Sequence, residues 1–138
     1  MTDLLLRGHV ILEEAIHENA VIRCAGGRIV SIEAYNPEHE AEGLLDCGER
    51  YLAPGFVDIH VHGGAGADHM DGTPEAVRRT NVAHAKHGTT SIFPTTTTGS
   101  FAQLDAMVKV CENVQASWTP ADGARIAGIH FYGPYFAE

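Results

Sequence analysis

Beyond Pro54-Gly55 the chain alternates strand-like and helix-like segments, and this alternation restricts the fold more than any other feature. Apolar, β-branched runs predict strands, and apolar residues at helical spacing predict helices. Strands that alternate with helices form parallel β-α-β units whose helices cover the sheet. The predicted segments are a strand over Phe56–His62, a helix bounded by Thr73 and Gly88, a strand over Thr89–Phe93, a helix that follows Ser100, and a strand over Arg125–Phe131. This part of the chain is therefore predicted to be α/β.

The residues before this boundary have an all-β pattern. Two β-rich runs, 20–25 and 28–32, flank Gly26-Gly27, which is the signal of a hairpin with a two-residue turn. The remaining segments predict strands over 4–12, 44–48 and 51–52 and a polar loop over 37–43. We expect two domains, 1–53 and 54–138, and find no motif that suggests chemistry in the first.

Both predicted helices begin with capping signals. Thr73 precedes Pro74, an arrangement typical of an N-cap followed by the first helical residue. Ser100 and Gln103 form the S-x-x-Q pattern of a capping box. The second helix is expected to bury one apolar stripe, which consists of Phe101, Leu104, Met107, Val108, Cys111 and Val114.

Two histidines end the first strand of the α/β segment. His60 and His62 are two positions apart, so both imidazoles are expected on one side of the strand. Two imidazoles on one side can share a divalent metal ion, at N–metal distances of about 2.0–2.1 Å for zinc. The glycine-rich residues 63–66 let the chain leave the strand without crowding that site. The pair is a candidate metal site, and two ordinary strand histidines are the alternative.

Polar residues also follow the other two strands. In a parallel α/β barrel, catalytic groups lie at the carboxyl ends of the strands. Four threonines, 95–98, follow the second strand, and we favour a surface turn for them. His130 and Tyr132 share one side of the third strand, and we favour a hydrogen-bonded interior histidine for His130. Asp58 lies on the same side as His60 and could support its imidazole.

Composition argues against several classes of partner. The formal net charge is −9 with no cluster of Lys or Arg, so neither nucleic acid nor an anionic membrane surface is expected as a partner. Three widely spaced cysteines suggest reduced thiols. The pattern of a signal peptide and the run of about 20 apolar residues of a membrane span are both missing, so a cytoplasmic location is expected.

Several segments together resemble a known family. Residues 52–64 (LAPGFVDIHVHGG) resemble the first barrel strand of the amidohydrolase superfamily. Four further segments resemble the N-acetylglucosamine-6-phosphate deacetylases in order and spacing, namely 68–71 (DHMD), 87–91 (HGTTS), 94–96 (PTT) and 128–135 (GIHFYGPY). The preceding all-β segment resembles the N-terminal part of that family's small β-sandwich domain. The resemblance covers the whole chain and identifies it as the N-terminal portion.

The resemblance implies both a fold and an activity. The fold is the N-terminal part of a small β-sandwich domain, followed by the first three β/α units of a TIM-like (β/α)8 amidohydrolase barrel. The activity is metal-dependent hydrolysis of the acetamide of N-acetylglucosamine 6-phosphate, or of a close N-acetyl amino-sugar phosphate, to acetate and the amino-sugar phosphate. His60 and His62 match the metal ligands of the family's first strand. The expected cofactor is a divalent metal, zinc first, with iron or another divalent ion as alternatives.

Two departures from the family pattern affect the site. Tyr132 stands where the family has a metal-ligating glutamate, and a neutral phenol is a poorer ligand at pH 7. Tyr132 is therefore a substrate-binding candidate, as a hydrogen-bond donor, or it fills the site and weakens metal binding. The family's later histidines, catalytic aspartate and phosphate-binding residues would follow Glu138, and a (β/α)8 barrel typically needs about 250 residues. No catalytic residue is therefore assigned within the 138 residues.

Alternatives remain open at this point. The chain could be part of another amidohydrolase, such as a dihydroorotase-like or dipeptidase-like hydrolase, or a barrel fragment without catalytic activity. Three parallel strands without closure leave strand edges and apolar surface uncovered, which predicts a homo-oligomer or association with the remainder of the barrel.

Overall fold

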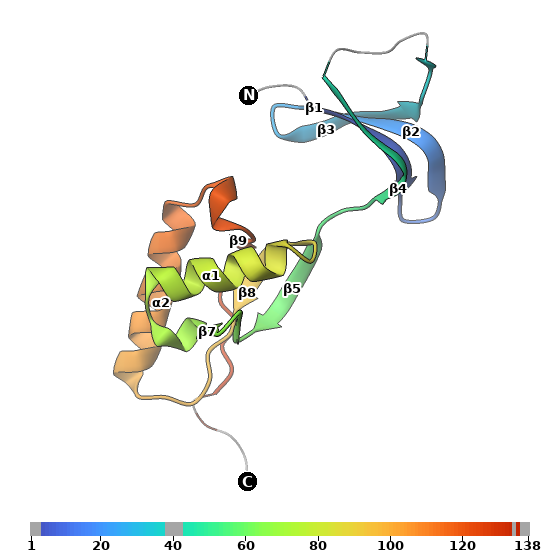
Figure 1. Ribbon diagram of the computed structural model, residues 1–138. Helices are drawn as coiled ribbons and strands as arrows, with labels where there is room; N and C mark the ends of the chain where they lie inside the picture. Colours follow the sequence, from blue (N-terminus) through green and yellow to red (C-terminus); the bar gives the residue numbers. More distant parts are fainter. Residues whose placement is uncertain (1–3, 38–42, 134, 136–138) are drawn as a thin grey trace. The chain divides into compact units, whose positions relative to one another are not determined.

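The computed structural model describes residues 4–37, 43–133 and 135, and the chain divides into two compact units, Met1–Pro54 and Gly55–Glu138 (Figure 1). Residues 38–42 of the predicted polar loop lie outside the described part. In that part, no helix is both long and apolar enough to cross a membrane.

The first unit is a four-stranded sheet in the order β3-β2-β1-β4. β2 (Ile16–Ala25) is antiparallel to β1 (Leu4–Ile11) and to β3 (Arg28–Ala34), whereas β4 (Leu44–Leu52) is parallel to β1. The predicted hairpin is confirmed, since Gly26 and Gly27 link β2 to β3 with positive φ angles of 59° and 77°. The two predicted pieces at 44–48 and 51–52 form one strand. The register of its pairing with β1 shifts part-way along, where Gly48 has a φ of 59°.

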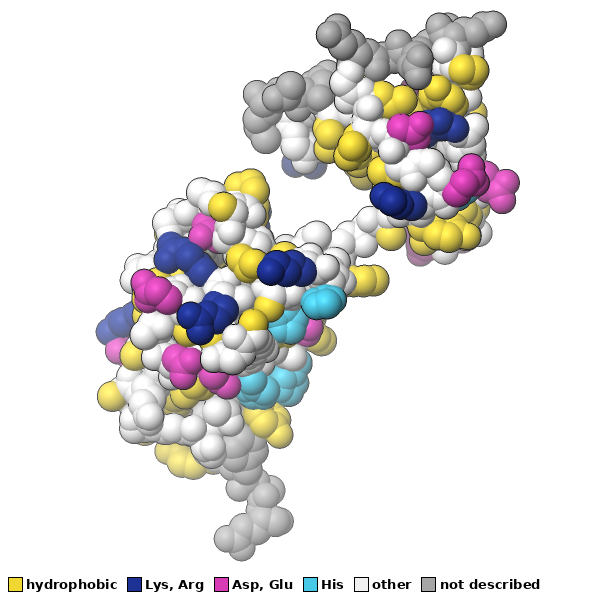
Figure 2. All heavy atoms as spheres, viewed as in Figure 1, with side chains coloured by type: hydrophobic (Ala, Val, Ile, Leu, Met, Phe, Trp, Pro, Cys, Tyr) yellow, Lys and Arg dark blue, Asp and Glu magenta, His cyan; other side chains and the backbone are white. Residues whose placement is uncertain are grey.

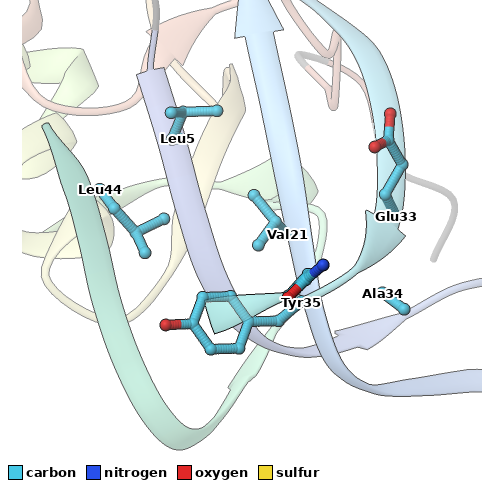
Figure 3. Close-up of a pocket in the computed structure, with 7 residues that line it drawn as sticks. Leu5, Val21, Glu33, Ala34, Tyr35 and Leu44 are labelled. Carbon is cyan, nitrogen blue, oxygen red and sulfur yellow. The ribbon is translucent and has the colours of Figure 1, made fainter. Parts of the chain in front are cut away.

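This sheet carries a small buried cluster and a separate hollow. Leu6, Ile22 and Ile32 are paired in one row and pack with the buried residues Val10 and Ala20. The same unit has a hollow of about 130 Å³, lined by Leu5, Val21, Glu33, Ala34, Tyr35, Asn36 and Leu44. Figure 3 shows these lining residues. The described residues of this unit form a single sheet, so the β-sandwich stays a prediction.

The second unit has the predicted alternation of strands and helices. Its sheet is parallel, in the order β5-β8-β9, with β5 (Phe56–Val61), β8 (Thr89–Pro94) and β9 (Arg125–Ile126). The helices α1 (Pro74–Ala85) and α2 (Phe101–Ala116) are the connections between consecutive strands (Figure 1). The shorter elements are the strands β6 (Gly63–Gly64) and β7 (Ala67–Asp68) and the 3-10 helices η2 (His69–Asp71) and η3 (Pro120–Asp122).

The third predicted strand is shorter than expected. Regular pairing with β8 covers Arg125–Ile126 alone, and a single bridge further along joins His130 to Thr95, the residue after β8. Alternating apolar residues favour extended backbone, but a strand also needs a continuous hydrogen-bonding partner. The residues between Ile126 and His130 lack that continuous pairing.

The capping predictions for both helices are confirmed. Thr73 Oγ1 accepts a hydrogen bond from Ala76 N at 3.2 Å, and Ser100 forms the reciprocal capping box with Gln103. The buried core between the helices and the sheet consists of Val61, Val77, Ile92, Met107, Cys111, Val114, Ala124 and Ile126. Of the predicted stripe, Met107, Cys111 and Val114 are buried in this core and Val108 packs against it. Leu104 is half-buried, and Phe101, the first residue of α2, is 74% exposed.

Candidate functional site

The two strand histidines meet at the carboxyl end of β5. The Nε2 atoms of His60 and His62 are 3.1 Å apart, and their ring centroids are 5.0 Å apart. The side chain of His60 is exposed and that of His62 is half-buried. Figure 2 shows histidine side chains gathered along one side of this unit. The two imidazoles therefore point toward a common position that solvent can reach.

This geometry fits two ligands of a divalent cation. In a tetrahedral zinc site with N–metal distances of about 2.0–2.1 Å, neighbouring ligand atoms are about 3.3–3.4 Å apart. The 3.1 Å between His60 Nε2 and His62 Nε2 is close to that separation. No group of three or more His, Cys, Asp or Glu side chains that could hold a metal ion occurs among the described residues. The described part of the chain thus offers a pair of ligands rather than a complete metal site.

His130 and Tyr132 lie against the histidine pair. The ring centroid of His130 is 4.8 Å from that of His60, and the ring of Tyr132 is 5.3 Å from His60 and 6.1 Å from His62. His130 Nδ1 donates to the carbonyl oxygen of Ile59 at 2.6 Å. The interpretation of His130 as hydrogen-bonded is confirmed, but its side chain is half-buried and packs on the site rather than in the interior.

Thr95 joins the end of β8 to the histidine strand. Its backbone N–H donates to the carbonyl oxygen of Val61 at 2.8 Å, and its Oγ1 accepts from Val61 N at 2.9 Å. The same hydroxyl donates to the carbonyl oxygen of Phe93 at 3.0 Å. Because Val61 separates His60 from His62, Thr95 fixes the backbone between the two imidazoles.

Thr96 holds the other side of the site in the same manner. Its Oγ1 accepts from Tyr132 N at 2.9 Å and donates to the carbonyl oxygen of Tyr132 at 3.1 Å. Its backbone N–H donates to the carbonyl oxygen of His130 at 3.0 Å. Both threonines are fully buried, so the prediction of a surface turn is wrong for this pair. Both residues have a structural role, because their hydrogen bonds connect the segments that carry His60, His62, His130 and Tyr132.

Asp58 does not support an imidazole as predicted. Its Oδ1 accepts from the backbone N–H of His60 at 3.2 Å, so the carboxylate is tied to the backbone of its own strand. Alternation along the strand could not reveal that the partner is a backbone N–H rather than an imidazole.

A fourth histidine, which the sequence patterns did not single out, contacts the backbone of His62. His69 is fully buried at the start of η2, and its ring and its backbone N–H both donate to the carbonyl oxygen of His62, at 2.9 and 2.8 Å. Burial lowers the pKa of His69, although the side chain of Asn81 and nearby backbone carbonyls oppose the shift. The imidazole is therefore neutral at pH 7. His69 stands outside the strand periodicity, so its role could not be inferred from spacing.

Comparisons with known proteins agree on one group of relatives. No protein-family model matches the chain. A protein of Escherichia coli O157:H7 named N-acetylgalactosamine-6-phosphate deacetylase is 32% identical over 140 residues, which cover 99% of this chain and 34% of that protein. A protein of Lysinibacillus sphaericus named N-acetylglucosamine-6-phosphate deacetylase is 34% identical over 113 residues, which cover 81% of this chain and 28% of that protein. The chain is a homologue of the N-terminal part of the N-acetylglucosamine-6-phosphate deacetylases.

A solved structure agrees with this relationship. N-acetyl-D-glucosamine-6-phosphate deacetylase from Mycobacterium smegmatis, in complex with N-acetyl-D-glucosamine-6-phosphate, matches with a TM-score of 0.79 and 27% identity, over 99% of this chain and 34% of that one. The family resemblance predicted from the sequence is thus confirmed. The chain spans about a third of the length of the curated relatives it matches.

Proposed function

We propose that this chain supplies the N-terminal third of a metal-dependent deacetylase that acts on an N-acetylhexosamine 6-phosphate. The observation that carries the proposal is the approach of His60 Nε2 to His62 Nε2 at the end of β5, in a chain whose relatives are named deacetylases of such sugars. The named relatives include both the glucosamine and the galactosamine compounds, so the proposal extends to this class of sugar phosphate.

His60 and His62 would hold a divalent cation, zinc first, which when bound supplies an acidified water and polarises the acetamide carbonyl. Other residues of the site keep the two histidines in position. Thr95 and Thr96 keep the strand ends together, and His130 packs against His60. A phenol at Tyr132 has a hydroxyl that can donate a hydrogen bond to a substrate carbonyl. Ligands to complete the site, and the residue that transfers the proton, would have to come from outside the described residues.

The same proposal covers the architecture and the partners. We propose that β5, β8, β9 and their helices are the first three β/α units of a TIM-like barrel. β5 is an edge strand, and Phe56, Val57 and Ile59 on it are 65%, 59% and 63% exposed. Edge strands with exposed apolar side chains are usually covered. The rest of the barrel, or a second copy of the chain, would cover them. A cytoplasmic location stays part of this proposal.

Zinc binding by the 138-residue chain is the first test. We expect wild type to bind zinc and His60→Ala/His62→Ala to lose that stoichiometry, as measured by equilibrium dialysis with metal analysis. His87→Ala is the matched control, because His87 is exposed and lies on the loop after α1. Zinc binding that is unchanged in the double variant would contradict the site.

Acetate release is the second test, with the 6-phosphates of N-acetylglucosamine and N-acetylgalactosamine as substrates. The 138-residue chain with added zinc is expected to release no acetate, because a pair of ligands does not complete the site. If the reading frame continues past Glu138, we expect the longer product to release acetate and to lose this activity in His60→Ala/His62→Ala. A longer product that binds zinc but hydrolyses neither sugar would contradict the deacetylase and favour another amidohydrolase or an inactive protein.

A further inference from the structure

His69 is a buried histidine that the proposed chemistry does not use. It is 0% exposed, lies at the first position of η2 and follows the short hairpin that β6 and β7 form. Its ring nitrogens have different environments. Nδ1 faces a backbone carbonyl, whereas Nε2 is buried without a hydrogen-bond partner among the described residues. Burying a polar ring in this way is costly, so its place beside the site calls for an explanation.

The contact that His69 makes is with the backbone of a proposed metal ligand. The carbonyl oxygen of His62 accepts two hydrogen bonds from the same residue, from His69 N at 2.8 Å and from His69 Nδ1 at 2.9 Å. A carbonyl can only accept, so Nδ1 carries the proton of the neutral ring. The direction of the His62 carbonyl is therefore fixed from two donors at once.

Among the described residues, no hydrogen bond holds the ring of His62 from its far side. His62 Nδ1 is buried and has no partner among the described residues. Metal-binding histidines usually donate this second ring nitrogen to a carbonyl or carboxylate, which orients the ring. Since no described residue gives the His62 side chain that support, the backbone of His62 has to set the direction of its ring.

We infer that His69 is a positioning residue for His62: its Nδ1–H fixes the His62 carbonyl and so directs His62 Nε2 toward the position shared with His60. This inference rests on the proposed function, because it concerns metal binding by the pair. His69 itself is not a candidate ligand. Its Nδ1 faces a carbonyl, and its Nε2 points into the buried region next to Asn81 of α1, away from solvent.

Asn81 of α1 is a fully buried neighbour of His69. Its side chain opposes the lowering of the His69 pKa, and its backbone carbonyl accepts from Ala124 N at 3.1 Å. Neither polar atom of the Asn81 side chain has a hydrogen-bond partner among the described residues, and the same holds for His69 Nε2. Among those residues, the hydrogen bond that fixes the His69 ring is therefore the one from Nδ1 to the carbonyl of His62.

Three substitutions of His69 separate positioning from packing. The amide nitrogen of Asn can take the place of Nδ1, that of Gln takes the place of Nε2, and Leu keeps the volume with no donor. By isothermal titration with zinc alone, we expect His69→Leu and His69→Gln to weaken binding about 10–100-fold, the usual effect of losing a residue that orients a ligand. His69→Asn is expected to stay within about threefold of wild type, because it keeps the donor to the carbonyl of His62.

Thr80→Val is the matched control. Thr80 is also fully buried, has a hydroxyl without a partner among the described residues, and precedes Asn81 on α1. We expect this variant to bind zinc like wild type. Far-UV circular dichroism on every variant restricts the comparison to folded protein, and the Gln and Asn pair remains informative if Leu fails to fold.

The outcomes distinguish the two proposals. A wild-type chain that binds no zinc would overturn the proposed function and this inference together. Zinc binding in which His69→Gln equals wild type, or His69→Asn falls as far as His69→Gln, would overturn the inference alone. An equal loss in Thr80→Val would also overturn it, because packing rather than the Nδ1 donor would then explain the effect.

Discussion

Replacing Thr95 with valine should destabilise the α/β unit without creating a cavity. Valine has nearly the same shape as threonine, so the change removes one hydroxyl and leaves the packing intact. That hydroxyl accepts from Val61 N at 2.9 Å and donates to the carbonyl oxygen of Phe93 at 3.0 Å, in a residue that is 0% exposed. Thr95→Val therefore leaves a donor and an acceptor unpartnered in a buried region.

The magnitude follows from these two groups. An unsatisfied buried N–H at Val61 costs about 1–3 kcal/mol, and the lost bond to Phe93 adds about 1 kcal/mol. The methyl group that replaces the hydroxyl regains about 0.8 kcal/mol by its burial. We expect the free energy of unfolding to fall by about 1–3 kcal/mol. The matched control is Thr98→Val, since Thr98 is exposed in the same threonine run, and it should change by less than about 0.5 kcal/mol.

Urea denaturation of both variants measures the difference. The midpoint for Thr95→Val should fall by about 1 M at an unchanged slope, and exchange of the Val61 amide hydrogen should accelerate by about tenfold or more. If Thr95→Val is as stable as Thr98→Val, or if the Val61 amide stays protected, the hydroxyl bridge is not what holds the two strand ends together.

Two further predictions concern titratable groups in the same unit. Burial raises the pKa of Cys111 to about 12, and its thiol is fully buried. Iodoacetamide at pH 8 should therefore label Cys24 and Cys47 but leave Cys111 unmodified until urea unfolds the chain. Rapid labelling of all three cysteines, detected by mass spectrometry, would contradict the placement of Cys111 in the core. Hydrogen bonds from Thr119, and then the guanidinium of Arg78 at 2.8 Å, lower the pKa of Asp122. The stability that Asp122 contributes is therefore present above the ordinary carboxyl pKa of about 3.9 and is lost as pH falls through its lowered value. Asp122→Asn should be less stable than wild type at pH 6 and approach it at pH 2–3, and a difference that is constant with pH would contradict this assignment.

Local features of the sequence were sufficient for much of the fold. The caps at Thr73 and Ser100, the turn at Gly26-Gly27 and the side of β5 that carries His60 all depend on residues within a few positions of one another. Backbone geometry at that range follows from steric preference and nearby hydrogen bonds, so these features could be predicted. The length of the third strand could not be predicted in this way. It was expected over Arg125–Phe131 but ends at Ile126, where continuous pairing with β8 ends.

The contacts that shape the site join residues far apart in the chain. Thr95 bonds to Val61 across 34 positions, Thr96 to Tyr132 across 36, and His130 to Ile59 across 71. No spacing rule specifies such partners, because they depend on which strand lies beside which and on how deeply each side chain is buried. The approach of two imidazoles can thus be predicted from the spacing of His60 and His62 in a strand. What holds that pair in place, and how much of it solvent can reach, follows only from packing in three dimensions.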